Sequence, residues 1–251
     1  MLEVSGITQI FGGVTALEDV SFSIRKGDIT GVIGPNGAGK TTLFNIITGI
    51  YTQTAGRVVL NDTDVSGLPP EKLVRLGLVR TFQNIELFGG MSVLENVMVG
   101  LHTRSSSGLL ACSLRMPWSR REEVRIRSGA LKWLEFTGIA DLAGVTAANL
   151  PFGKGRMLEI ARALAAEPVI ILMDEPAAGL NSQETLGLAQ LIRRIRDLGI
   201  TVVLVEHDME LVMDICDRIV VLNLGRKLTE GIPCEIQENH EVIAAYLGDD
   251  D

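Results

Sequence analysis

Apolar residues along this chain occur in two alternating patterns. One is a run of four to six mostly apolar residues, which is typical of a strand buried between helices in a parallel sheet. Such runs occupy residues 169–173, 200–205 and 219–222. The other pattern spaces apolar residues three or four apart, as in the stripe that ends at Gly199, and it predicts amphipathic helices. Alternation of these patterns predicts a doubly wound α/β core.

The start of the chain is different. Short apolar and β-branched runs are separated by turns at residues 7–10, 20–24, 29–33 and 57–60. This spacing predicts an antiparallel β layer that leads into a strand at 28–33. Helical spacing returns between residues 92 and 146 and predicts an α-helical part of the chain.

A glycine-rich loop connects the strand at 28–33 to a helical run at 41–48. Its residues are Gly34, Pro35, Asn36, Gly37, Ala38, Gly39, Lys40, Thr41 and Thr42. They fit the pattern G-x-x-x-x-G-K-[ST], in which glycines let backbone N–H groups turn toward an anion. Lys40 is placed to reach the β- and γ-phosphates, and Thr41 can offer a hydroxyl to Mg²⁺. Because the next helix also directs its positive end at the loop, we predict a P-loop that binds a nucleoside triphosphate.

An acidic pair follows the apolar run at 169–173. Asp174 is expected at the carboxyl end of that strand, beside the P-loop, where ligands bind in sheets of this kind. Its carboxylate can hold Mg²⁺ or the waters around it, and Glu175 can polarise the water that attacks the γ-phosphate. An Asp-Glu pair alone also fits a surface turn, but the P-loop upstream favours a catalytic pair.

Two more polar residues end predicted strands. His207 follows the run at 200–205, and a neutral imidazole there could donate a hydrogen bond to the γ-phosphate or to its attacking water. Gln83 ends a predicted strand at 78–82, and its amide can ligate Mg²⁺ through oxygen and donate through nitrogen. We therefore expect catalytic roles for Lys40, Glu175 and His207, and Mg²⁺ ligands at Thr41, Gln83 and Asp174.

Phe11 precedes two glycines between predicted strands. An aromatic residue at such a loop tip is more typical of packing than of ligand contact. Its distance before the P-loop also permits stacking on a purine, which is worth roughly 1–3 kcal/mol. Phe11 is therefore a candidate for binding the base.

Composition narrows the class of protein. The net charge of −8 argues against a general nucleic-acid binder, because phosphate contacts need clustered Lys and Arg. Three widely spaced cysteines predict no disulfide set.

The first residues lack a basic segment followed by an apolar stretch, and no run approaches about 18 apolar residues, so we expect a cytoplasmic protein that touches a membrane only through a partner. Residues 104–127 are locally basic, which fits either a solvated helix face with a flexible loop or a patch facing a partner or anionic lipid.

Together these motifs resemble the ATP-binding subunits of ABC transporters, over essentially the whole chain. The similar elements are the adenine-stacking aromatic (Phe11), the Walker A loop (34–41), the Q-loop glutamine (Gln83), the Walker B pair (174–175) and the switch histidine (His207).

The resemblance implies one ABC ATPase domain at 1–251, of the P-loop NTPase class with a RecA-like core. We expect the nucleotide-binding α/β core at 1–83 and 158–251, and a helical subdomain with the signature segment at 84–157. ATP and Mg²⁺ are the implied cofactors. The implied partners are a second ATPase subunit, identical or different, in a nucleotide sandwich, then membrane-spanning permease subunits and, indirectly, a solute-binding protein. The expected location is the cytoplasmic face of the cell membrane.

Shorter segments resemble the importers of branched-chain amino acids, namely residues 80–83, 87–88, 91–96, 175–181 and 242–248. The insertion at 104–127 is similar to one of the two ATPase subunits of those importers. The resemblance thus implies a motor for import of branched-chain amino acids or similar small solutes. Urea importers and lipopolysaccharide exporters share much of the core. Soluble ABC ATPases of translation or DNA repair, and small P-loop kinases, are alternatives from other classes.

The sequence departs from the family pattern at the signature segment. Where the family usually has Leu-Ser-Gly-Gly-Gln, this chain has Leu150, Pro151, Phe152, Gly153 and Lys154. The absent serine hydroxyl would have made a hydrogen bond to phosphate worth about 1.5–3 kcal/mol, although a helix that begins after proline still favours an anion. Asn181 likewise stands where the D-loop usually has aspartate. Both changes imply two unequal nucleotide sites and a heterodimeric partner.

Overall fold

The computed structural model describes residues 1–102 and 117–247, so most of the basic segment predicted at 104–127 lies outside the described residues. The chain forms two compact units, one made of Met1–Gln83 with Val169–Asp251 and the other of Asn84–Pro168. Within the described ranges, none of the helices combines the length and the apolar character that crossing a membrane requires.

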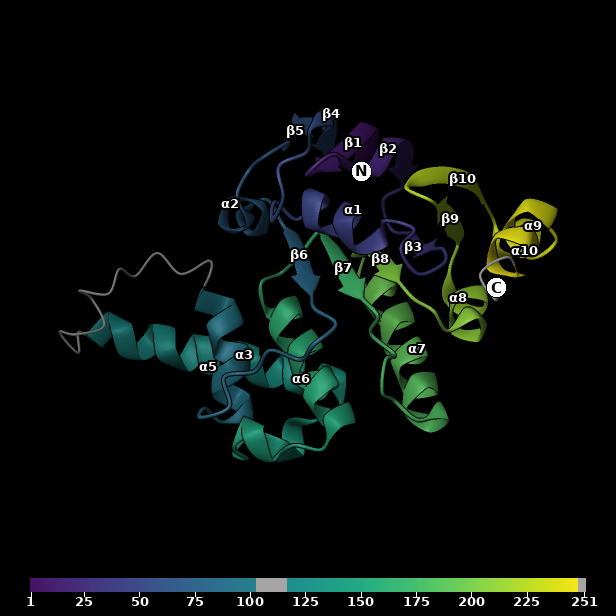
Figure 1. The fold of residues 1–251 in the computed structure, drawn as a ribbon. Helices are drawn as coiled ribbons and strands as arrows, with labels where there is room; N and C mark the ends of the chain where they lie inside the picture. The colour runs from purple at the N-terminus through teal and green to yellow at the C-terminus, as the bar shows by residue number, and fades with distance from the viewer. Residues whose placement is uncertain (103–116, 248–251) are drawn as a thin grey trace. The chain divides into compact units, whose positions relative to one another are not determined.

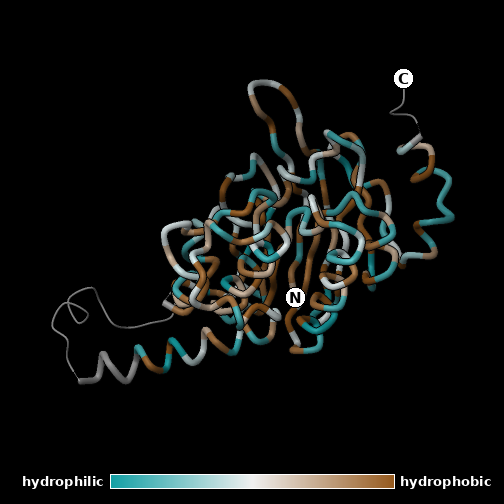
Figure 2. The backbone as a smooth tube through the Cα atoms, turned by 90° about the horizontal axis from the view of Figure 1, so that it is seen from below, coloured by the Kyte–Doolittle hydropathy of each residue, from teal (hydrophilic) through white to brown (hydrophobic). Residues whose placement is uncertain are grey.

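The first unit contains a six-stranded sheet with the order β10-β9-β3-β8-β7-β6 (Figure 1). Its neighbours pair in parallel, except for the antiparallel β9 and β10. Every residue of β3, β7 and β8 is buried. Figure 2 colours the backbone by the hydropathy of each residue. This sheet confirms the predicted doubly wound core. The strands are β3 (Ile29–Ile33), β6 (Leu78–Thr81), β7 (Ile170–Asp174), β8 (Thr201–Val205), β9 (Arg218–Asn223) and β10 (Arg226–Gly231).

The predicted antiparallel layer is a four-stranded sheet with the order β2-β1-β4-β5. Its strands are β1 (Leu2–Phe11), β2 (Val14–Ile24), β4 (Ala55–Leu60) and β5 (Thr63–Asp64). β1 and β2 are longer than the predicted runs at 7–10 and 20–24, because cross-strand pairing from Leu2↔Ile24 to Phe11↔Val14 extends a hairpin through residues of weak strand propensity.

The helices of the first unit are α1 (Lys40–Ile47), α2 (Pro70–Arg75), α7 (Ser182–Asp197), α8 (Met209–Ile215), α9 (Pro233–Gln237) and α10 (His240–Leu247). One core joins the two sheets through α1, where buried Leu43 and Phe44 belong to the same cluster as Leu2 of β1 and Leu172 of β7. This packing fixes the start of α1, and therefore the P-loop before it. The sequence patterns described above did not predict β10, α9 or α10.

The second unit is helical, with α3 (Val93–His102), α5 (Pro117–Thr137), α6 (Phe152–Ala165) and the short 3₁₀ turns η1 (Ala140–Leu142) and η2 (Ala147–Asn149). Its separate core includes buried Val97, Leu134 and Leu158, one from each long helix. Ser92 and Glu95 begin α3 with reciprocal hydrogen bonds between side chain and backbone N–H, at 2.7 and 3.2 Å.

Candidate active site

Four neighbouring parallel strands place the predicted site residues at one edge of the six-stranded sheet. The strands β3, β8, β7 and β6 are adjacent in that order, so their carboxyl ends lie together. The residues that follow these ends are the P-loop after β3, His207 after β8, Glu175 after β7 and Gln83 after β6.

The P-loop requires glycine at two positions for steric reasons. Gly34 has φ +154°, and a Cβ there would lie 2.1 Å from the carbonyl oxygen of Leu222. Gly39 has φ +96°, and its Cβ would lie 2.9 Å from the carbonyl oxygen of Ala16. Both contacts would be shorter than 3.0 Å and would involve backbone atoms, which cannot swing aside. Glycine at these two positions therefore lets β9 and β2 pack directly against the loop.

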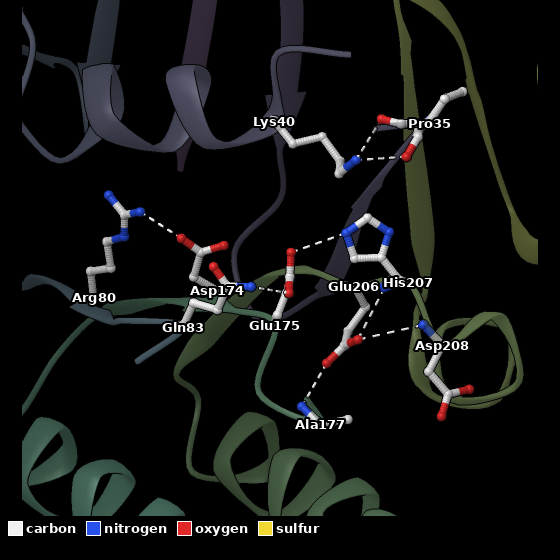
Figure 3. Close-up of polar contacts among 11 residues, drawn as sticks. Pro35, Lys40, Arg80, Gln83, Asp174, Glu175, Ala177, Glu206, His207 and Asp208 are labelled. Carbon is white, nitrogen blue, oxygen red and sulfur yellow. Dashed lines mark hydrogen bonds and ion pairs between the residues drawn. The ribbon is translucent and has the colours of Figure 1, made fainter. Parts of the chain in front are cut away.

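Lys40 is the first residue of α1 and only 6% exposed. Its Nζ donates hydrogen bonds to the carbonyl oxygens of Gly34 (2.6 Å) and Pro35 (2.8 Å), which are part of the same loop (Figure 3). Burial lowers the pKa of Lys40, and the charges of Glu175 and Asp174 oppose that shift. The lysine of the P-loop thus lies within the electrostatic field of the acidic pair.

Asp174 is the last residue of β7 and is buried. Its Oδ2 accepts a hydrogen bond from Nη2 of Arg80 at 2.6 Å (Figure 3). Arg80 also donates through Nη1 to Oδ1 of Asn45 on α1 (2.6 Å) and to Oγ1 of Thr48, the C-cap of α1 (3.1 Å). The guanidinium therefore joins β6, α1 and the predicted metal ligand.

Sequence reasoning missed Arg80 as a site residue. A charged residue between buried residues of the short strand β6 was the available signal, because a buried arginine needs an anionic partner. Its guanidinium carbon also lies 4.9 Å from the ring centre of Phe82 and 5.7 Å from that of Phe44, in cation–π geometry.

Glu175 is held by two of the predicted site residues. Its Oε2 accepts a hydrogen bond from Gln83 Nε2 at 2.6 Å, and its Oε1 lies 3.0 Å from His207 Nε2 (Figure 3). The Glu175 backbone N–H donates to the carbonyl oxygen of Val205 at 2.9 Å. Its φ of +46° is unusual for a residue with a side chain, and such strain concentrates where function fixes a conformation.

A pocket of about 480 Å³ lies over the P-loop, a volume within the ordinary range of ligand sites. It is lined by residues 14–16, 36–42, 175, 207 and 224–225. The lysine, the backbone N–H groups of the loop and the hydroxyls of Thr41 and Thr42 suit a polyphosphate. Oxygen donors at Thr41 and Asp174 suit Mg²⁺, which keeps several waters and needs few protein ligands. Among the residues that the structure describes, no group of three or more His, Cys, Asp and Glu side chains is placed to hold a metal.

Five predicted site residues of the first unit do not line this pocket as the described residues define it: Phe11, Gly34, Pro35, Gln83 and Asp174. Gln83 contacts Glu175, which lines the pocket, and Asp174 directly precedes Glu175 and pairs with Arg80. Phe11 instead packs edge-on against Tyr51, with ring centres 5.3 Å apart, while Val14 to Ala16 of the next strand reach the pocket. The base-stacking role of Phe11 stays a prediction.

The signature residues belong to the second unit, where they begin α6. Pro151 is the N-cap with an extended backbone, Phe152 is 52% exposed and Lys154 is also exposed, while Gly153 is buried. Leu150 packs against the helical core.

Asn181 performs a local structural task. Its Oδ1 accepts hydrogen bonds at 3.0 Å from the backbone N–H groups of Gln183 and Glu184 at the start of α7. Glu184 in turn accepts from the Asn181 N–H at 3.0 Å, which completes a capping box.

A strand leads into a glycine loop with a buried lysine, and a helix follows the loop. Acidic residues at the end of a nearby parallel strand lie close to this loop. This arrangement defines a P-loop nucleoside triphosphatase. The family model for the ABC transporter matches residues 17–178, and that for the branched-chain amino acid ATP-binding cassette transporter matches residues 226–251. The chain therefore belongs to the ABC transporter family, as an ATP-hydrolysing subunit.

Individual relatives support the assignment to the ABC transporter family. The high-affinity branched-chain amino acid transport ATP-binding proteins LivG of Salmonella typhimurium and BraF of Pseudomonas aeruginosa are each 45% identical over 250 residues, covering 99% of this chain and 98% of theirs. An ABC transporter ATP-binding cassette in its ADP conformation is 34% identical, with a TM-score of 0.86 and coverage of 99% of this chain and 98% of that one. The dimeric structure of a bacterial ABC transporter cassette is 27% identical, with a TM-score of 0.78 and coverage of 93% and 99%.

Proposed function

We propose that this chain hydrolyses ATP to power import of branched-chain amino acids or similar small solutes across a membrane. The observation that carries the hydrolytic part is the Glu175 carboxylate, which Gln83 and His207 hold at a pocket formed by the P-loop. The choice of solute rests on the similarity to LivG and BraF over nearly the whole chain.

In this proposal the P-loop N–H groups and Lys40 bind the β- and γ-phosphates of ATP. Thr41 and Asp174 provide oxygen donors for Mg²⁺, with the Gln83 amide as a further candidate. When bound, Mg²⁺ would neutralise charge on the phosphate oxygens. Arg80 holds the Asp174 carboxylate in its orientation through the 2.6 Å contact.

Glu175 is the proposed general base. Its carboxylate removes a proton from the water that attacks the γ-phosphorus, a role typically worth 10²–10⁴-fold in rate. Gln83 and His207 restrict that carboxylate from two sides, at 2.6 and 3.0 Å. His207 also lines the pocket and can donate a hydrogen bond to the γ-phosphate.

The proposed assembly contains a second ATPase subunit, identical or different, and membrane-spanning permease subunits that receive solute from a binding protein. Its place is the cytoplasmic face of the cell membrane. The resemblance to a dimeric cassette supports the pairing. The exposed start of α6 supports it too, since helix N-terminal N–H groups after Pro151 suit the phosphates of a nucleotide bound to a second subunit.

The test is transport by the complex that co-purifies with this chain from membranes. In proteoliposomes loaded with Mg·ATP, we expect uptake of radiolabelled leucine, and loss of that uptake with Lys40→Met. Uptake of urea without leucine would contradict the proposed solute. Isolation of the chain with ribosomes or DNA, and without membrane proteins, would contradict the transport function.

A further inference from the structure

Glu206 lies between strand β8 and His207 and is only 3% exposed. Its carboxylate accepts hydrogen bonds from two different segments. Oε1 accepts from the backbone N–H of Ala177 at 2.7 Å, and Oε2 accepts from the backbone N–H of His207 at 3.1 Å, with a longer contact of 3.5 Å from that of Asp208 (Figure 3). One buried side chain thus joins the turn after β7 to the turn after β8.

This contact lies where the sheet itself ends. Asp174 and Val205 are the last paired residues of β7 and β8, and the next N–H, that of Glu175, donates to the carbonyl oxygen of Val205. Two residues further along, the Ala177 N–H donates to the side chain of Glu206. The carboxylate therefore provides a link between the two segments beyond their last backbone pairing.

The two segments carry the side chains that meet in the candidate active site. Glu175 precedes Ala177 by two residues, His207 follows Glu206 directly, and their side chains lie 3.0 Å apart. We propose that Glu206 is a positioning residue for ATP hydrolysis, which fixes the backbone of His207 relative to the turn at 175–177. The inference rests on the proposed hydrolytic function, and it adds a residue that none of the sequence motifs assigned.

All three partners are backbone N–H donors, which suits a side chain that presents two acceptor oxygens. Burial raises the pKa of Glu206, and the backbone N–H groups of Ala177, His207 and Asp208 oppose that rise. In Glu206→Gln one oxygen becomes an NH₂ group of equal size, which would face an N–H. Glutamine therefore fills the same volume and loses one of the two links. A residue that merely fills space would tolerate this change.

The test measures kcat and KM for Mg·ATP hydrolysis in the purified assembly. Glu206→Gln should lower kcat roughly ten- to hundredfold, since a hydrogen bond to a charged group is worth about 1.5–3 kcal/mol. KM should stay within about twofold, because the P-loop contacts are unchanged. The matched control is Glu210→Gln, an exposed residue in the first turn of α8, which should keep both constants.

A double-mutant cycle with His207→Ala separates positioning from general damage. In the His207→Ala background, Glu206→Gln should lower kcat by no more than about threefold, because the side chain that it positions is absent. An equal fold-loss in both backgrounds would overturn the inference, and so would an unchanged kcat in Glu206→Gln alone.

Amide hydrogen exchange provides a readout that does not depend on turnover. Exchange at Ala177 or at His207, whichever loses its acceptor, should accelerate at least about tenfold in Glu206→Gln while exchange in β3 keeps its wild-type rate. Unchanged exchange at both residues would overturn the inference. If the wild-type assembly hydrolyses no ATP, the proposed function fails as well. If it hydrolyses ATP and His207→Ala slows it while Glu206→Gln does not, the inference alone fails.

Discussion

Replacing Arg80 with methionine tests how strongly the buried ion pair with Asp174 supports the first unit. Methionine keeps an unbranched aliphatic stem beside Phe44 and Phe82 and removes the guanidinium. The Arg80 and Asp174 side chains are only 6% and 7% exposed, and their closest N and O atoms are 2.6 Å apart. Breaking such a pair by removing one partner costs about 3–5 kcal/mol, because the remaining charge is buried without compensation.

The same unit contains a matched control. Arg193 and Asp214 are joined at 2.7 Å, almost the same distance, but their side chains are 37% and 53% exposed. Water screens this pair, so Arg193→Met should lower the free energy of unfolding by only about 0–1 kcal/mol. The two pairs have similar distances and differ in burial, and Arg80 also donates to Asn45 and Thr48, so the comparison sets the buried contacts of Arg80 against an exposed pair.

The assay is equilibrium unfolding in urea, which gives the free energy of unfolding of each variant. Arg80→Met should lose about 3–5 kcal/mol, and adding Asp174→Asn should restore part of the loss by removing the unpaired charge. Equal losses in Arg80→Met and Arg193→Met would refute the reasoning. No recovery with Asp174→Asn would show that the loss comes from packing instead of charge.

Three other predictions concern the loop, pH and thiols. Gly39→Ala should weaken ATP binding roughly tenfold more than Gly37→Ala in a fluorescence titration, since both glycines have positive φ but only a Cβ at residue 39 would clash with backbone; equal affinities would contradict this. Because burial raises the pKa of Glu206, the folded state binds that proton more tightly than the unfolded state does. The Glu206 contribution to stability should therefore fall as pH rises from the ordinary glutamate value of about 4.3 through the raised value, and the melting temperature of wild type minus that of Glu206→Gln should decrease across this window; a constant difference would argue against the shift. Burial raises the pKa of the Cys216 thiol to about 12, so iodoacetamide at pH 8 should modify exposed Cys234 before Cys216, as mass spectrometry of peptides will show, and modification of Cys216 before Cys234 would contradict its burial.

The buried strands and the P-loop were predictable because their signals are local. A buried parallel strand must be apolar along its whole length, and a phosphate loop needs glycines at fixed spacing. The hairpin of β1 and β2 was only partly predictable, since its ends are strands through pairing with each other and with β4.

The contacts of Arg80 and Glu206 depend on strands distant in sequence. Arg80 on β6 reaches Asp174 across 94 positions, and Glu206 reaches Ala177 across 29. The sequence offers only indirect signals, a charge within a short strand and a second acid beside His207. Both become informative once the order of β6, β7 and β8 is known. Phe11 shows the converse difficulty, because an aromatic residue at a loop tip fits packing as well as base stacking, and in this structure its ring contacts Tyr51.

The central claim is that Glu175 acts on ATP bound by the P-loop at 34–42. The most direct measurement compares ATP binding and phosphate release in wild type and Glu175→Gln, in the same assembly with Mg²⁺ present. We predict that Glu175→Gln binds ATP within about threefold of wild-type affinity and releases phosphate at least about 10²-fold more slowly. Phosphate release at the wild-type rate would contradict the claim.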